Sequence, residues 1–158
     1  MAYPAGRSII EEGVDRILTR EVFLHFLDLE VKRSRRYQNF FSVLILKLDE
    51  LPDHENGTAI QACRGRLTRL VAEEMRDSDI LGALGEKSLA VILPYADLTA
   101  GGNTRSRFES SLQFYDFSRD GFRVVIEQVC FPRDGTDISD LVRKVAGIET
   151  SHQRQEPI

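Results

Sequence analysis

The chain has 158 residues, of which 42% are hydrophobic and 29% charged, and its formal net charge is −4. This length and composition are typical of one globular domain, and the mild acidity argues against a general nucleic-acid binder. The longest apolar run, Leu89 to Leu93, is far shorter than the roughly 20 residues of a membrane span. The first seven residues contain no apolar stretch of a secretory signal, so we expect a cytoplasmic protein.

The N-terminal part of the chain is predicted to be helical. We expect a flexible arm at residues 1–7, and apolar residues at three- and four-residue spacing predict helices at 8–18 and 20–36. Residues 1–18 thus form an arm and linker helix. The second helix ends in a basic cluster, which consists of Lys32, Arg33, Arg35 and Arg36. Cations at the C-terminal end of a helix interact favourably with the helix dipole. We therefore interpret this cluster as structural rather than as a phosphate-binding site.

The rest of the chain alternates between strand and helix patterns. Residues 40–48 are apolar on both faces, which predicts a central strand that is covered on each side. The later elements are a loop at 49–57, a helix over 58–75, a hairpin over 79–93, a helix from Asp97 or Thr99 to Leu112, an aromatic loop at 114–121, a strand at 122–131 and a helix from Asp137 to Glu149. This order predicts an α/β fold with a mixed central sheet of about five strands flanked by helices. We expect a disordered tail at 151–158.

The two cysteines indicate no disulfide framework. Cys63 falls in a helical pattern and Cys130 in a strand pattern, so we expect two reduced cysteines in the core. The sequence contains no serine or cysteine nucleophile motif, no P-loop and no G-x-G-x-x-G stretch. The common enzyme motifs therefore do not identify an activity.

The hairpin between Arg76 and Pro94 is the most informative stretch. Two short apolar strands are joined by a turn of four residues, Gly85 to Ser88. The tip of such a hairpin is a place where side chains meet solvent and ligands. We therefore expect this tip and the polar residues before it to decide the function.

Three stretches, in this order, resemble the GGDEF domain, which is the fold of diguanylate cyclases. They are L-E-V-K-R-S-R-R-Y-Q-N-F-F-S-V-L-I-L-K-L-D at 29–49, S-D-I-L-G-A-L-G-E-K-S-L-A-V-I-L-P at 78–94 and F-P-R-D-G-T-D-I-S-D-L at 131–141. The resemblance covers roughly residues 15–148, and we assign the domain to 19–150. It implies a GGDEF-like α/β fold, with the hairpin at the signature position, and a role in bacterial signalling.

Active members of this family condense two GTP molecules into cyclic di-GMP, with metal ions at the hairpin tip and the first strand. Mg²⁺ prefers carboxylate ligands and bridges the substrate phosphates. The resemblance places Gly85, Glu86, Lys87, Ser88 and Leu89 on the five signature positions. Only the first glycine is retained, and a lysine and a serine replace the two acids.

The first strand departs from the family in the same way. Lys47 stands where the family has its metal-binding aspartate, and Asp49 matches the second aspartate of the family's D-x-D pattern. The guanine-reading asparagine has only a poor substitute in Asn56, and the C-terminal phosphate-binding cations have no match. We therefore expect a degenerate, catalytically inactive domain without a metal ion or cofactor.

One family motif is retained. The product-inhibition site is R-x-x-D, and here Arg76 and Asp79 stand five residues before the signature. An arginine can donate two hydrogen bonds to guanine O6 and N7, and Arg107 is the candidate for an assisting second arginine, with Arg105 behind it. The alternative is that Arg76 complements the helix dipole or pairs with Asp79.

Three functions remain open from the sequence. The leading hypothesis is a catalytically inactive GGDEF-like regulatory or interaction module, and in one version of it Arg76, Asp79 and Arg107 bind cyclic di-GMP. The second is a pure protein-interaction or dimerisation domain that uses its first helices or the aromatic loop with Phe114, Tyr115 and Phe117. The third is a residual cyclase or another nucleotidyl-handling enzyme, with Mg²⁺ held by Asp49, Asp53 and Glu86.

Overall fold

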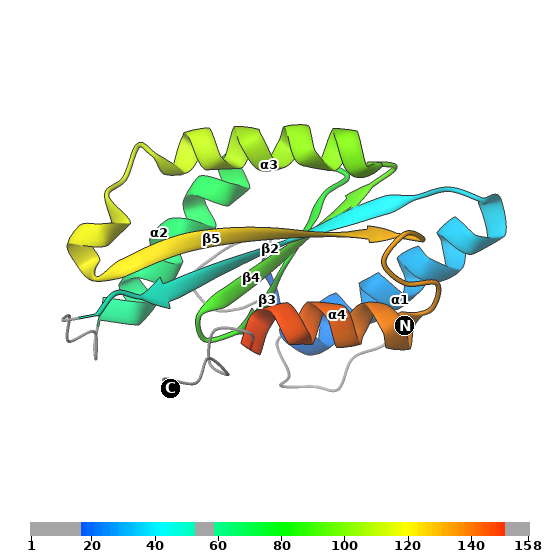
Figure 1. Cartoon of the computed structure of the whole chain (residues 1–158), viewed down its shortest axis with the longest axis horizontal. Coiled ribbons are helices and arrows are strands. Elements are labelled where there is room, and N and C mark those ends of the chain that lie inside the picture. The colour runs from blue at the N-terminus through cyan, green and yellow to red at the C-terminus, as the bar shows by residue number, and fades with distance from the viewer. Residues whose placement is uncertain (1–16, 53–58, 151–158) are drawn as a thin grey trace.

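The structure, a computed structural model, describes residues 17–52 and 59–150 (Figure 1). Within these residues, five strands form one mixed sheet in the order β1-β3-β4-β2-β5. The strand β1 is parallel to β3, and all other neighbours are antiparallel. The elements are β1 (Ile17–Leu18), α1 (Arg20–Tyr37), β2 (Phe41–Glu50), α2 (Ala59–Glu74), β3 (Ile80–Gly85), β4 (Ser88–Pro94), α3 (Leu98–Leu112), the 3-10 helix η1 (Phe117–Asp120), β5 (Phe122–Phe131) and α4 (Ile138–Thr150).

Helices cover both faces of the sheet. Figure 1 shows α2 and α3 on one side of the strands and α1 and α4 on the other. Each side holds its own apolar core, and β2 contributes to both because its residues alternate between the two faces. All eight residues from Phe41 to Leu48 are buried. The prediction of an α/β fold with a mixed sheet, helices on both sides and a doubly covered central strand is confirmed.

The prediction of a helix over 8–18 is wrong at its C-terminal end. Ile17 and Leu18 form the strand β1, which pairs with Leu81 and Gly82 of β3. Ile17 is buried against the sheet, and this long-range pairing overrides the local helical spacing. Residues 1–16, and with them the predicted arm, lie outside the described residues, as does the predicted tail at 151–158. The helix predicted over 20–36 is confirmed as α1.

The helix α3 lies close to the sheet because of a glycine in its first turn. Asp97 caps this helix by accepting a hydrogen bond of 2.8 Å from the backbone N–H of Ala100. A Cβ atom on Gly101 would lie only 2.2 Å from Nε2 of Gln128 and 2.7 Å from Oγ of Ser42. The sequence suggests a weak helix start at this glycine, whereas the structure requires it for contact with β2 and β5.

Both cysteines are buried free thiols, as the sequence predicts. Burial, the largest cause, raises the pKa of the Cys63 thiol to about 11. This thiol is therefore neutral at physiological pH, and it packs from α2 into the apolar core as a small apolar side chain. No helix in the described ranges is long and apolar enough to cross a membrane.

Two neighbouring glycines of α3 test this packing. Gly101→Ala should lower the free energy of unfolding by about 1–3 kcal/mol, because overpacking outweighs the gain in helix propensity. Gly102→Ala is the matched control, since its Cβ atom would have its nearest neighbour at 3.9 Å, and it should raise stability by about 0.5–1 kcal/mol. Urea unfolding of the two variants measures the difference in their free energies of unfolding. Equal stabilities would contradict the close packing of Gly101 against β2 and β5.

Candidate functional site

The hairpin tip adjoins the C-terminal end of β2. Strands β3 and β4 are joined by a turn at Glu86 and Lys87, with Gly85 and Ser88 paired across it. The backbone N–H of Leu48 donates a hydrogen bond of 2.8 Å to the carbonyl oxygen of Lys87. The predicted hairpin is confirmed, and its tip lies beside the strand end that the sequence resemblance associates with it.

Lys47 is the buried cation of this site. It lies opposite Ser88 of β4 and Val125 of β5, and only 3% of its surface is exposed. Cross-strand neighbours share one face of a sheet, so Lys47 and Ser88 point to the same side, the side covered by α1 and α4. A positive charge therefore occupies the strand position where the resemblance implies a metal-binding acid.

The two acids that end β2 face cations of the same chain. Oε1 of Glu50 lies 2.5 Å from Nζ of Lys87, and Oδ2 of Asp49 lies 3.7 Å from Nη2 of Arg123 on β5. In the part of the chain that the structure describes, no three His, Cys, Asp or Glu side chains converge as metal ligands. Asp53, an acid of the enzyme hypothesis, lies outside the described residues.

The acid of the R-x-x-D motif closes a turn. Oδ2 of Asp79 accepts a hydrogen bond of 2.9 Å from the backbone N–H of Arg76, and the N–H of Asp79 donates one of 3.1 Å to the carbonyl oxygen of Arg76. Asp79 is only 8% exposed, whereas Arg76 is exposed. The motif thus combines a structural carboxylate in the turn between α2 and β3 with an arginine side chain at the surface.

The structure brings Arg107 to the same end of α2. Its Nη2 donates a hydrogen bond of 3.3 Å to the carbonyl oxygen of Glu74, and its Nε lies 3.7 Å from Oε2 of that residue. Glu74 precedes Arg76 by two positions, so Arg107 contacts the chain close to the motif. A shared ligand site of the two arginines stays a prediction. Arg105 instead forms an ion pair of 3.6 Å with Glu109 along α3.

Comparison with solved structures identifies the fold. The sequence matches no protein-family profile and no curated protein. The GGDEF domain of YfiN from Pseudomonas aeruginosa superposes with a TM-score of 0.74 at 16% identity, over 90% of this chain and 94% of that chain. The chain has the GGDEF fold.

Two further GGDEF structures were determined as complexes. The GGDEF domain of DgcB from Caulobacter crescentus, in complex with cyclic di-GMP, has a TM-score of 0.65 at 12% identity, over 97% of this chain and 93% of that chain. The diguanylate cyclase SiaD from Pseudomonas aeruginosa, in complex with its activator SiaC, has a TM-score of 0.71 at 18% identity, over 87% of this chain and 55% of that chain. At these identities, the similarity establishes the GGDEF fold itself.

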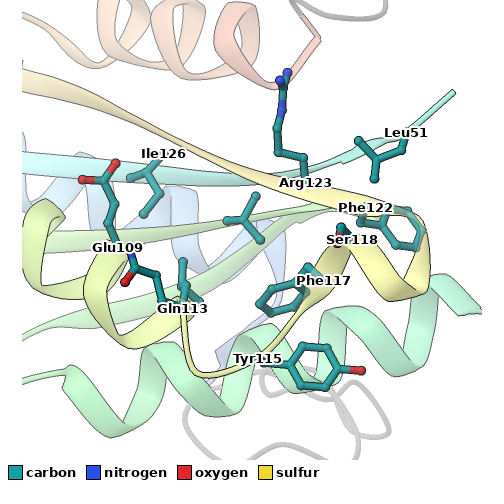
Figure 2. Close-up of a pocket in the computed structure, with 11 residues that line it drawn as sticks. Leu51, Glu109, Gln113, Tyr115, Phe117, Ser118, Phe122, Arg123 and Ile126 are labelled. Atoms are coloured by element: carbon teal, nitrogen blue, oxygen red, sulfur yellow. The ribbon is translucent and has the colours of Figure 1, made fainter.

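This GGDEF fold also contains a pocket of about 380 Å³ between α3, η1 and β5 (Figure 2). Its lining is mainly apolar, and Figure 2 shows the side chain of Arg123 directed away from the aromatic rings. Except for Leu51, its lining comes from one continuous stretch, residues 109–126, which includes the aromatic loop. The lining residues are Leu51, Glu109, Leu112, Gln113, Tyr115, Phe117, Ser118, Phe122, Arg123, Val124 and Ile126.

Most of the aromatic loop serves the fold. Phe117 is buried in the core under α2 and α3, and the guanidinium of Arg66 lies 4.2 Å from the ring centre of Tyr115. The hydroxyl of Tyr115 donates a hydrogen bond to Asp120, which raises the pKa of the tyrosine. Phe114, at 88% exposure, is the aromatic residue of this loop that a partner could reach.

The basic cluster at the end of α1 contacts the protein itself. Arg33 pairs with Glu30 and donates a hydrogen bond of 2.8 Å to the hydroxyl of Tyr95. Lys32 forms an ion pair with Asp28, and Arg35 donates a hydrogen bond to the carbonyl oxygen of Thr136. The guanidinium of Arg36 lies over the ring of Tyr37. These contacts support the structural interpretation of the cluster.

The roles of the two motif residues can be separated by stability. Asp79→Ala should lower the free energy of unfolding by about 1–3 kcal/mol, because it leaves the backbone N–H of Arg76 without its acceptor. Arg76→Ala keeps that N–H and should change stability by less than about 0.5 kcal/mol. Thermal unfolding of both variants provides the measurement. Equal losses would show that the carboxylate is not the structural member of the pair.

Proposed function

We propose that the chain is a catalytically inactive GGDEF-like module with a regulatory or interaction role. The observation that carries this proposal is the charge distribution at the end of β2, where Lys47 is buried and Lys87 lies 2.5 Å from Glu50. Phosphoryl transfer with Mg²⁺ requires carboxylates that hold the ion against the substrate phosphates. A metal ion here would meet two ammonium groups instead. A cytoplasmic location stays a prediction.

An enzyme that holds Mg²⁺ through Asp49, Asp53 and Glu86 is the alternative. Asp49 faces Arg123 at 3.7 Å, and Glu86 is exposed in the hairpin turn. A metal ion would therefore have to compete with an arginine for one ligand. This competition makes the inactive module the better supported function.

Turnover of GTP tests catalytic inactivity. We expect the protein, incubated with GTP and either Mg²⁺ or Mn²⁺, to form no cyclic di-GMP, because Lys87 and Ser88 stand at the two positions where the resemblance implies signature acids. Chromatographic analysis of the nucleotides gives the readout, and an active diguanylate cyclase run in parallel shows that the conditions support the reaction. Product in molar excess over the protein would overturn the proposal.

Within this function we propose that cyclic di-GMP binds at the end of α2. The exposed side chain of Arg76 and the neighbouring Arg107 supply guanidinium groups that can donate to guanine O6 and N7. Asp79 uses Oδ2 for the backbone N–H of Arg76, and a carboxylate has further acceptor capacity for a guanine edge. The similarity to the DgcB complex with cyclic di-GMP supports this version.

Calorimetric titration of cyclic di-GMP decides whether the site is a receptor. Arg76→Ala should weaken binding by at least about tenfold, since a lost charge-assisted hydrogen bond contributes about 1.5–3 kcal/mol. Arg105→Ala is the matched control, because that arginine pairs with Glu109 on the same helix as Arg107, and it should bind like the wild type. An absence of heat from the wild type at high micromolar ligand would eliminate the receptor version.

A protein-interaction or dimerisation domain is the second candidate function. The exposed Phe114 at the end of α3 favours it, because large aromatic side chains at the surface are common anchors of interfaces. The similarity to SiaD, whose structure contains its activator SiaC, is compatible with a protein partner. Loss of the receptor version would leave this candidate as the function of the module.

A further inference from the structure

The strand β5 forms a long edge of the sheet. Its ten residues pair with β2 along their whole length, and within the described residues no strand pairs with its other side. In Figure 1, β5 crosses the front of the molecule with α3 on one side and α4 on the other. Unpaired N–H and C=O groups along such an edge are a template for another strand. β5 contains no proline that would block this pairing.

The charges of β5 are self-complementary. Arg123 and Glu127 lie on the same face of the strand, because they are four residues apart, and Val125 lies midway between them. If two β5 strands meet in antiparallel orientation about a two-fold axis at Val125, each Arg123 lies opposite the Glu127 of the other copy. A register shifted by two residues in either direction would place one of the charges opposite Val125 instead. Charge pairing therefore selects a single register.

Both charged side chains are accessible to a second copy. The side chain of Arg123 is 64% exposed, and its contact with Asp49, at 3.7 Å, is a long one. Glu127 is half-buried and forms no salt bridge within the described part of the chain. A partner strand would supply the cation that this carboxylate lacks there.

On the opposite face of β5, the same register brings apolar side chains of the two copies together. Val124 and Ile126 face α3 and line the pocket of about 380 Å³. Pairing about Val125 puts the Val124 of each copy opposite the Ile126 of the other copy. Apolar cross-strand pairs thus meet on the pocket side, while ion pairs meet on the side of α1 and α4.

We propose that the chain forms a symmetric dimer in which β5 pairs with β5 of a second copy and the two five-stranded sheets become one continuous sheet. Self-pairing of a surface about a two-fold axis is the commonest route to a closed assembly. The proposal goes beyond the regulatory function proposed above and does not depend on it, since it requires no nucleotide and no motif residue.

Sedimentation equilibrium of the full chain with charge variants tests the register. The wild type should reach twice its chain mass of 18.0 kDa at micromolar concentrations. Glu127→Arg and Arg123→Glu each place like charges opposite one another and should weaken association by at least about tenfold. The double variant Arg123→Glu with Glu127→Arg restores opposite charges and should recover association to within about threefold of the wild type.

Controls separate strand pairing from other effects. Arg143→Glu changes an exposed arginine on α4 and should leave association unchanged. The double variant also loses the contact with Asp49, so its recovery cannot come from that ion pair. If a charge variant fails to fold by circular dichroism, Val125→Lys, which sets two lysines together at the axis, replaces it. A monomeric wild type at about 200 μM, dimers indifferent to these substitutions, or no recovery in the double variant would each overturn the proposal.

Discussion

The structure depends on the burial of β2 between two strands and two layers of helices. Its residues pair with β4 on one side and with β5 on the other, and its side chains enter both apolar cores. A strand covered in this way cannot shift its register without exchanging its two faces. The position of the hairpin tip follows from this, because β4 is held in register with β2 up to the pair of Lys47 and Ser88.

The same burial gives the charges at the end of β2 their importance. A charge taken out of water is costly unless neighbouring groups compensate for it. A buried acid at position 47 would favour a bound cation, whereas a buried lysine requires negative or polar surroundings. With Glu50 facing Lys87 and Asp49 facing Arg123, this end of the sheet supplies its own cations. The proposed function therefore assigns this chain the GGDEF fold without the chemistry of a metal site.

Much of the fold could be predicted because local and long-range preferences agree. The helix α1 and the strand β5 were predicted from spacing and apolar pattern, and Asp97 and Asp137 mark the starts of α3 and α4. The prediction failed at Ile17 and Leu18, where pairing with β3 outweighs the helical spacing. The close approach of Gly101 to Ser42 could not be predicted, because it depends on how near α3 comes to the sheet.

The sequence by itself determined the order of elements, the lysines at positions 47 and 87, and the presence of Arg76 and Asp79 before the hairpin. These are properties of residue identity and local spacing. Only the tertiary structure decided that Asp79 accepts a hydrogen bond from the backbone N–H of Arg76, that Arg107 reaches the end of α2, and that β5 is an edge strand. The contact of Arg107 joins residues 33 positions apart, and the turn at Arg76 and Asp79 takes its geometry from the helix and the strand on either side. Such geometry is fixed only when the sheet and its helices pack together.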